Sequence, residues 1–183
     1  WEPRNWAASE GAGSIHDDTT AEELGFRGGT VPGDVHMNQF PPMLVKLFGH
    51  KWFEKGHLSL NFKNATTDRE KVKVIVDIPK PDASQTNVRM EREDGMLVCL
   101  GTAGIGNHEW SALQTQDLQP CEPKELRILN NLHPGMSLGQ YEVFVSADKQ
   151  IDRFDAGLIS DPLECYKDSS LFGGILPAPC TVI

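Results

Sequence analysis

The chain has 183 residues, which is enough for one domain with its own hydrophobic core, or for one domain and part of another. Its net charge is −9 and no cluster of lysine and arginine stands out, so nucleic acid and anionic membrane surfaces are excluded as expected partners. No apolar run approaches the roughly 18 residues that a membrane-spanning helix needs, and no signal peptide is visible, so we expect a cytoplasmic protein.

The cysteines give no sign of a metal centre or of a disulfide framework. None of the four stands in a Cys-x-x-Cys pair, and they are too scattered for a set of structural disulfides in a chain of this length. We therefore expect reduced thiols, no bound metal and no cofactor. The four residues are Cys99, Cys121, Cys165 and Cys180.

The first 33 residues contain a short helix between two irregular segments. A polar lead-in covers residues 1–13, and Thr19 or Thr20 can then cap a helix that ends at Gly25. The glycine-rich stretch 27–33 follows, and it predicts a loop with an unusually free backbone.

A long amphipathic helix is predicted over residues 34–48. Pro41 and Pro42 must bend or interrupt it, and Gly49 ends it. Asp34 is expected to cap the helix rather than to act as an acid catalyst. The apolar positions fit a broad helical face, and they are Val35, Met37, Phe40, Met43, Leu44, Val45, Leu47 and Phe48.

Beyond the helix the apolar period changes from helical to alternating. Residues 58–63 and 71–78 each predict a half-buried strand. Apolar residues within 88–103 suggest two more strands, joined by a hairpin turn at residues 93–95. One long helix followed by antiparallel strands indicates an α+β fold.

The C-terminal third is harder to assign. Residues 107–134 have no clean period and are predicted to be a connector, with a short helix near 124–129. A strand is predicted over 141–146, and a turn or short helix over 148–159.

A weak internal repeat links the two ends of the chain. The segment Gly28-Gly29-Thr30-Val31-Pro32-Gly33 resembles Gly173-Gly174-Ile175-Leu176-Pro177-Ala178, at an offset of 145 residues. One interpretation is that a second unit opens near the C-terminus and stops before its central helix. The alternative is a C-terminal tail that merely packs on the first unit.

The arrangement of a histidine before a loop and a helix start suggests chemistry on a carbonyl group. His16 lies in a polar turn, and the loop 27–33 leads from there to the start of a helix, where backbone N–H groups point outward. A base that faces such amides suits reactions of a thioester carbonyl. Gly33 and His36 lie where they can face the same cleft.

The sequence resembles a known family at this point. The run Ile15-His16-Asp17-Asp18, with Ala21, Gly25-Phe26 and Val31-Pro32-Gly33, resembles the start of the MaoC-like (R)-specific enoyl-CoA hydratases. That resemblance implies the hotdog fold, in which an antiparallel sheet wraps one long central helix. It implies a hotdog unit over 1–106, a connector over 107–134, and the start of a second unit or a C-terminal extension over 135–183.

The family's motif is Gly-Asp-x-Asn-Pro-Leu-His-x-Asp, whose aspartate and histidine activate water for addition to an enoyl thioester. His16 and Asp18 match its end, whereas Gly11 stands where the motif has its aspartate. Glu10 is one residue away and can replace it only if the loop shifts. The family's His-Gly pair before the helix reads Pro32-Gly33 here, which leaves the Gly33 amide as the donor to the carbonyl.

Three functions follow from the resemblance. The first is an acyl-thioester hydratase or dehydratase, with His16 as base, Glu10 or Asp18 as its partner, and a substrate clamp at the end of the loop. The second is an acyl-CoA thioesterase, and the third is a non-catalytic hotdog half that supports a partner half. The expected partners are an acyl-CoA or acyl-carrier thioester and at least one further copy of the chain. The clamp consists of Val31, Pro32, Gly33 and His36.

Overall fold

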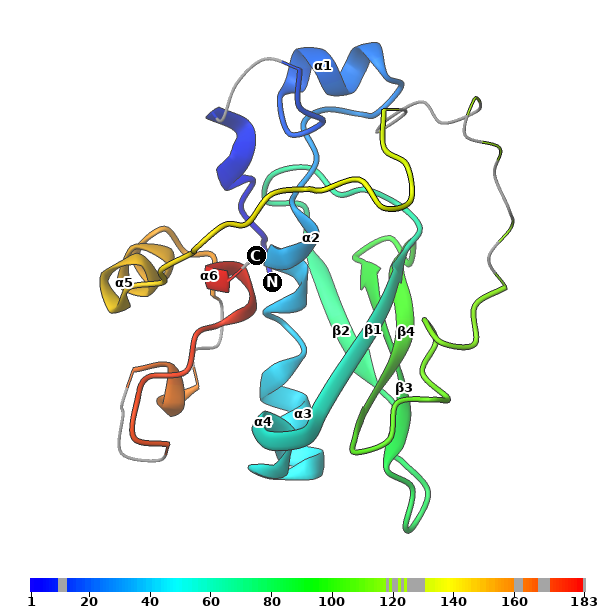
Figure 1. Ribbon diagram of the computed structural model, residues 1–183, viewed down its shortest axis with the longest axis vertical. Helices are drawn as coiled ribbons and strands as arrows, with labels where there is room; N and C mark the ends of the chain where they lie inside the picture. Colours follow the sequence, from blue (N-terminus) through cyan, green and yellow to red (C-terminus); the bar gives the residue numbers. More distant parts are fainter. Residues whose placement is uncertain are drawn as a thin grey trace.

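The computed structural model of the chain describes residues 1–9, 13–117, 119, 122, 124, 131–159, 163–167 and 172–182. It is a mixed α+β structure with a four-stranded antiparallel sheet, as the sequence predicted. Figure 1 shows the sheet on one side of a column of helices and the C-terminal segment on the other.

The sheet contains the four strands that the alternating pattern predicted. These are β1 (Gly56–Phe62), β2 (Val72–Val76), β3 (Gln85–Arg92) and β4 (Leu97–Ile105), in the spatial order β1-β4-β3-β2. Gly95 lies in the turn between β3 and β4 with a φ of 84°, a left-handed conformation that glycine adopts at little cost. The predicted hairpin is therefore confirmed.

The predicted helix over 34–48 is in fact two helices. Helix α2 spans Gly33–Met37 and helix α3 spans Pro41–Phe48, with a turn between them. The two prolines explain the break, because they lack the N–H groups that would continue α2, whereas the first positions of a new helix need no such donors.

Short helices complete the N-terminal two thirds of the chain. They are η1 (Trp6–Ser9), α1 (Asp18–Glu23) and α4 (Lys51–Lys55). The expected cap of α1 at Thr19 or Thr20 is wrong by two or three residues. Asp17 holds the N-cap position, and its side chain accepts a 2.9 Å hydrogen bond from the Thr20 N–H.

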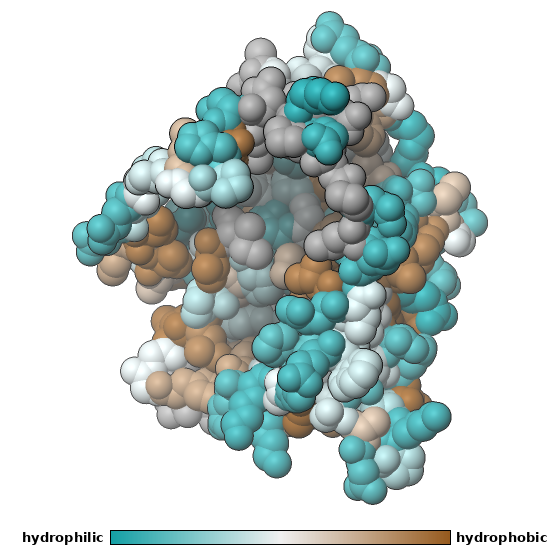
Figure 2. Space-filling model, turned by 45° about the vertical axis from the view of Figure 1, so that its right-hand side comes forward, coloured by the Kyte–Doolittle hydropathy of each residue, from teal (hydrophilic) through white to brown (hydrophobic). Residues whose placement is uncertain are grey.

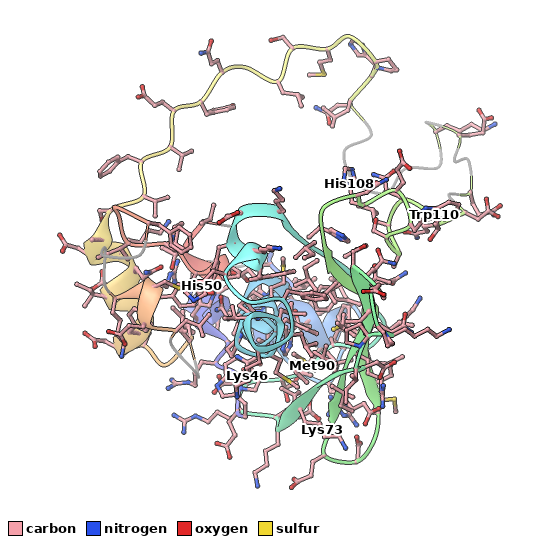
Figure 3. All side chains as sticks on the ribbon, turned by 90° about the horizontal axis from the view of Figure 1, so that it is seen from below. Lys46, His50, Lys73, Met90, His108 and Trp110 are labelled. Atoms are coloured by element: carbon pink, nitrogen blue, oxygen red, sulfur yellow. The ribbon has the colours of Figure 1, made fainter. Side chains whose placement is uncertain are left out.

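The C-terminal segment is helical where the sequence suggested a helix, but it lacks the predicted strand. Helix α5 spans Ala147–Asp155, followed by η3 (Glu164–Tyr166) and α6 (Pro179–Val182). Residues 141–144 are exposed, residues 145 and 146 are half-buried, and no other described segment pairs with residues 141–146 as a strand. Figure 3 shows this stretch standing away from the body of the molecule. An alternating pattern produces a strand only where a second strand pairs with it.

The helix predicted near 124–129 falls almost wholly outside the described residues.

The helix column packs into two separate apolar cores. The first lies between α3 and the sheet, where Phe40 and Leu44 are fully buried with residues such as Met90; Figure 3 looks along the helices toward this core. The apolar face of α3 is narrower than predicted, because Met43 and Leu47 are each 37% exposed. The second core lies between α2 and the C-terminal segment, and it consists of Val31, Val35, Leu158, Ile159, Cys165, Tyr166, Ala178 and Cys180.

A single buried amide joins α2 to two distant parts of the C-terminal segment. The Asn38 side chain donates a 3.1 Å hydrogen bond to the Leu158 carbonyl and accepts a 3.0 Å bond from the Cys180 N–H. Helices α2 and α6 contact one another, and each follows a Gly-Gly-x-x-Pro segment, α2 beginning one residue after its proline and α6 two residues after. The interpretation of these segments as an internal repeat remains a prediction.

No helix among the described residues is both long and apolar enough to cross a membrane. In Figure 2, hydrophilic residues separate the hydrophobic patches on the face shown. Cys99, Cys165 and Cys180 are buried free thiols, and Cys121 falls outside the described residues.

Candidate functional site

A pocket of about 300 Å³ brings together residues from four segments, three of which the sequence had singled out as parts of a site. Its walls come from the turn before α1, the glycine-rich loop, the start of α2 and the end of β1 with the residues after it. The lining is largely apolar, with two histidine rings and a lysine. The lining residues are Ile15, His16, Phe26, Thr30, Val31, Gly33, His36, Phe62, Lys63, Asn64, Ala65 and Thr66.

His16 is held by the backbone of the glycine-rich loop. Its Nδ1 lies 2.6 Å from the Thr30 carbonyl oxygen, and the Asn5 side chain donates a 2.9 Å bond to the His16 carbonyl. A carbonyl oxygen can only accept, so Nδ1 carries the proton and donates it to Thr30. In the neutral ring, Nε2 is then left with the lone pair that a general base needs.

The acidic neighbours of His16 in the sequence have other partners. Asp17 caps α1, and Asp18 Oδ1 accepts a 2.7 Å hydrogen bond from the Gly29 N–H. Gly29 itself lies against the His16 carbonyl, where a Cβ atom would clash with the backbone. Asp18 thus fastens the glycine-rich loop to the turn that carries His16. Glu10, the other proposed partner of His16, lies outside the described residues.

Gly33 and Phe62 form the opposite wall. Gly33 is the first residue of α2, and Pro32 before it occupies the N-cap position, whereas Val31 lines the pocket. A Cβ atom added to Gly33 would lie 3.2 Å from the Phe62 ring. The absence of a side chain at residue 33 therefore lets an aromatic ring from the sheet approach the start of the helix. Phe62 is 44% exposed, so its ring lies at the mouth of the pocket.

His36 is a second histidine in the pocket, and it is only 2% exposed. Its Nε2 lies 2.8 Å from the Thr66 hydroxyl, and its ring lies 6.2 Å from the ring of Phe62. Burial lowers the pKa of His36 to about 4, so the imidazole is neutral at physiological pH. The Nδ1 atom has no hydrogen-bond partner among the described residues.

The low pKa of His36 predicts that acid destabilises the protein. The unfolded chain binds a proton at His36 below about pH 6.5, whereas the folded chain does so only near pH 4. The free energy of unfolding should therefore fall as pH drops from about 6.5 to about 4, by at most about 3 kcal/mol from this residue. Urea titrations of the wild-type protein at several pH values measure the change.

A matched pair of variants isolates the contribution of His36. His36→Gln should flatten the pH dependence over this range, whereas His50→Gln, which changes an exposed histidine, should leave it in place. Equal slopes for the wild type and His36→Gln would contradict the buried neutral imidazole. The comparison is needed because Asp34, whose pKa is raised by burial, changes stability with pH in the opposite direction.

Asp34 does not cap α2 as the sequence suggested. Pro32 holds the N-cap position, and Asp34 lies in the first turn with only 8% of its surface exposed. Burial raises the pKa of this carboxyl group, while the backbone amides of Val35 and Asp34, together with Arg153 and His16, oppose the rise. Its Oδ2 atom has no hydrogen-bond partner in the described part of the chain.

A second pocket of about 330 Å³ adjoins the first and carries positive charge. The two share Phe26 and residues 63–65, and the second adds Arg27 and Arg92 to its lining. Both arginines contact Glu70, at 2.7 Å and 3.3 Å. The Arg27–Glu70 pair lies at the surface, since 55% of the Arg27 side chain is exposed.

Lys63 is the cation that both pockets share. It has no ion-pair partner among the residues that the structure describes. In the described ranges, no group of three or more His, Cys, Asp or Glu side chains is placed to hold a metal ion. The polar groups that line the two pockets include imidazole, hydroxyl, amide and cationic side chains.

The structure joins four of the predicted site residues in one pocket and adds several that the sequence did not indicate. His16, Val31, Gly33 and His36 line it together, whereas Pro32 and Asp18 support it from outside. Phe62 was missed because it belongs to an ordinary strand pattern, and Thr66 because it lies in the irregular stretch after that strand, far along the chain from His16. The Thr30 carbonyl was missed because a backbone acceptor leaves no mark in the sequence.

Comparisons with known proteins show a likeness to solved structures. No protein-family model and no curated protein sequence matches the chain. Among solved structures, the chain is similar to the (R)-hydratase from A. caviae involved in PHA biosynthesis, with 20% sequence identity and a TM-score of 0.35. The likeness covers 55% of this chain and 81% of that one. At these values it assigns neither fold nor activity to this chain, whose chemistry must be argued from the pocket.

Proposed function

We propose that the protein is an acyl-thioester hydratase or dehydratase with a hotdog-type scaffold, and that His16 is its base. The observation that carries this proposal is the hydrogen bond from His16 Nδ1 to the Thr30 carbonyl, which leaves Nε2 free beside a largely apolar pocket. A proton acceptor next to an apolar channel suits a substrate with an acyl chain and one reactive double bond.

One histidine suffices for the complete addition of water. His16 Nε2 takes a proton from a water molecule while the water oxygen bonds to the β-carbon of the enoyl group. The electrons of the double bond move to the thioester oxygen and give an enolate, which the Gly33 amide stabilises. The imidazolium then returns its proton to the α-carbon, so the ring is restored and water has added across the double bond. Dehydration is the same sequence in reverse.

The neutral state of His36 fits a role as a wall and hydrogen-bonding group rather than as a second base. With a pKa near 4, its ring is a poor proton acceptor at neutral pH. Together with Phe62 and Val31 it closes the pocket around the acyl group. Asp18 acts indirectly in this proposal, because its bond to Gly29 holds the loop whose carbonyl orients His16.

The cationic pocket gives the carrier a place to bind. Coenzyme A and phosphopantetheine both carry phosphate groups, and Lys63 and Arg27 lie where the apolar pocket opens into its neighbour. Such contacts attract a phosphate without taking part in the reaction. We therefore propose an acyl-CoA or acyl-carrier thioester as the substrate.

Lys63→Glu should raise KM for crotonyl-CoA about fivefold, with a smaller effect on kcat. The expected size corresponds to about 1 kcal/mol for the loss of an exposed charge contact. Added salt should reduce the difference, because it screens exposed charges. Steady-state kinetics at two ionic strengths measure both effects.

Two controls accompany this variant. Lys46→Glu makes the same charge change at an exposed position on α3 and should leave KM nearly unchanged. Crotonyl-pantetheine, which lacks phosphate, should bind the wild type and Lys63→Glu equally. An equal loss with both substrates would mean that Lys63 does not contact a phosphate group.

The activity itself is tested with the wild-type protein. Hydration of crotonyl-CoA, followed by the loss of the conjugated enoyl absorbance, is the expected result. Release of free thiol from saturated acyl-CoAs would instead establish the thioesterase, which would use the same base to activate water against the carbonyl. If neither reaction is detected, both enzyme proposals fail and the non-catalytic hotdog half becomes the best account of Gly11.

We also propose that the chain self-associates. In the part of the chain that the structure describes, β1 pairs only with β4 and has an open outer edge, whereas the start of β2 is covered by two hydrogen bonds with Trp1. Open strand edges favour pairing with another chain. Sedimentation at micromolar concentration should give at least a dimer, and a monomer across that range would contradict the proposal.

A further inference from the structure

The pocket that contains His16 is apolar at its mouth and polar at its floor. Three large apolar residues of the lining are 40–44% exposed, and they are Ile15, Phe26 and Phe62. The three least exposed residues of the lining are all polar, and they are Thr66 (1%), His36 (2%) and Thr30 (4%). A pocket for a plain hydrocarbon chain needs an apolar floor, because a buried polar group costs free energy unless it is hydrogen-bonded.

Two of the floor residues, His36 and Thr66, contact each other. Nε2 of His36 lies 2.8 Å from the Thr66 hydroxyl. The backbone holds both residues in place, since His36 belongs to α2 and the Thr66 carbonyl accepts a 2.9 Å hydrogen bond from the Val31 N–H. The pair therefore joins the start of α2 to the segment that follows β1, and it forms a fixed wall at the buried end of the pocket.

This pair has hydrogen-bonding capacity that no described residue uses. A threonine hydroxyl offers one donor and two acceptor sites, and a neutral imidazole offers one of each. Whichever tautomer the ring adopts, the contact within the pair uses one donor and one acceptor. Nδ1 of His36 has no partner among the described residues, and the Thr66 hydroxyl has no second one there. Thr30 differs, because its hydroxyl donates a 3.2 Å bond to the Ile15 carbonyl.

The unused donor and acceptors suit a neutral group that contains oxygen. Burial lowers the pKa of His36 to about 4, so the ring is uncharged at physiological pH and does not attract a carboxylate or a phosphate as a cation does. A metal ion fits poorly, since no group of three or more suitable side chains is placed to hold one in the described ranges. A hydroxyl or keto oxygen can pair with the floor without bringing charge into the buried end of the pocket.

We infer that His36 and Thr66 form a specificity site for an acyl chain that carries a hydroxyl or keto oxygen beyond its β-carbon. This oxygen is additional to the thioester carbonyl and to the hydroxyl that the reaction adds or removes. The inference rests on the proposed function, which makes the ligand an acyl thioester, and it names the class of acyl group. In a pocket of about 300 Å³ we expect the oxygen on carbon 4 or carbon 5, the first positions beyond the β-carbon.

Isothermal titration calorimetry with four CoA thioesters tests the inference. The compounds 4-oxopentanoyl-CoA and 5-oxohexanoyl-CoA are compared with 4-methylpentanoyl-CoA and 5-methylhexanoyl-CoA, in which a methyl group replaces the oxygen. None of them has an enoyl double bond or a β-hydroxyl group, so neither hydration nor dehydration consumes them. At least one oxo compound should bind the wild type about fivefold more tightly than its methyl counterpart, the gain expected from one neutral hydrogen bond.

Variants of Thr66 show whether the preference comes from the floor. Thr66→Val removes the hydroxyl at nearly constant shape and should abolish the preference, whereas Thr66→Ser keeps the hydroxyl and should retain it. Thr86→Val is the matched control. Thr86 is also buried, and its hydroxyl donates a 2.6 Å bond to the Asp77 carbonyl, but it does not line the pocket. This control should therefore bind all four compounds as the wild type does.

The outcomes separate this inference from the proposed function. Equal binding of the oxo and methyl compounds in both pairs would overturn the inference and leave an acyl-CoA ligand in place. A preference that survives in a folded Thr66→Val would overturn it as well. If none of the four compounds binds, the acyl-CoA ligand is contradicted, and the inference fails together with the function on which it rests. The comparison in the wild type needs no variant, so it decides the question even if Thr66→Val does not fold.

Discussion

His16→Ala is expected to reduce kcat/KM for a short enoyl-CoA by about 10²–10⁴, which is the usual effect of removing a general base. The loss should appear mainly in kcat, because the substituted ring acts on the water and the α-carbon rather than on the carrier. The variant should remain folded, since the ring is half-buried and, in the described part of the chain, makes hydrogen bonds only to Thr30. Far-ultraviolet circular dichroism and a urea titration check this.

His108→Ala serves as the matched control. His108, which is labelled in Figure 3, is exposed and is not among the residues that line the pocket. It should retain the wild-type rate. If His16→Ala keeps more than a tenth of the activity, another group is the base and the orientation of the ring by Thr30 has no catalytic consequence.

Leu44→Ala is expected to lower the free energy of unfolding by about 2–5 kcal/mol, as for other large-to-small changes in a core. Leu44 has no exposed surface, and it lies in the core that joins α3 to the sheet, with Phe40 and Met90. The cavity left by the substitution cannot close fully, because β3 and β4 form a continuous sheet on one side. Urea denaturation followed by circular dichroism measures the change.

Leu47→Ala is the control on the same helix. Leu47 is 37% exposed, so its loss removes less buried apolar surface and should cost about 1 kcal/mol or less. Equal losses for the two variants would mean that α3 does not bury one particular face against the sheet. That result would contradict the division of the molecule into two cores.

The sheet was predictable from the sequence because each strand carries its own local signal. The alternation in β1 and β2 can be recognised from neighbouring residues alone. Gly95 indicates a turn because glycine adopts a positive φ at little cost. Pro41 and Pro42 likewise predicted a bend or an interruption of the helix over 34–48. The sequence alone did not decide between one bent helix and two separate helices. Predictions from short stretches of sequence are reliable where neighbouring residues determine the backbone conformation.

The sequence predictions are wrong where the conformation depends on contacts between residues that are far apart in the chain. Residues 141–146 have the pattern of a strand but no partner, and pairing is a tertiary property that a pattern of side chains does not contain. The sequence pattern places Met43 and Leu47 on the apolar face of α3, but the sheet covers only the side that Phe40 and Leu44 occupy.

The candidate site shows the same division. His16 and Gly33 were found because their residue types suit the chemistry, and the structure places both in one pocket. The orienting group on His16 is a backbone carbonyl, which every residue has, so no sequence reading can single out Thr30. Asp34 was assigned as a cap because acidic residues favour helix starts, and only the structure shows that it is buried.

The two hydrogen bonds of Asn38 bear on the order in which the molecule assembles. They join residues 120 and 142 positions apart in the chain, so they form only after very long loops have closed. The sheet, by contrast, is built from strands that follow one another closely between residues 56 and 105. The sheet and α3 can therefore form first, and the C-terminal segment docks onto α2 afterwards. When the segment detaches from α2, both hydrogen bonds of Asn38 break and its buried amide becomes exposed to water.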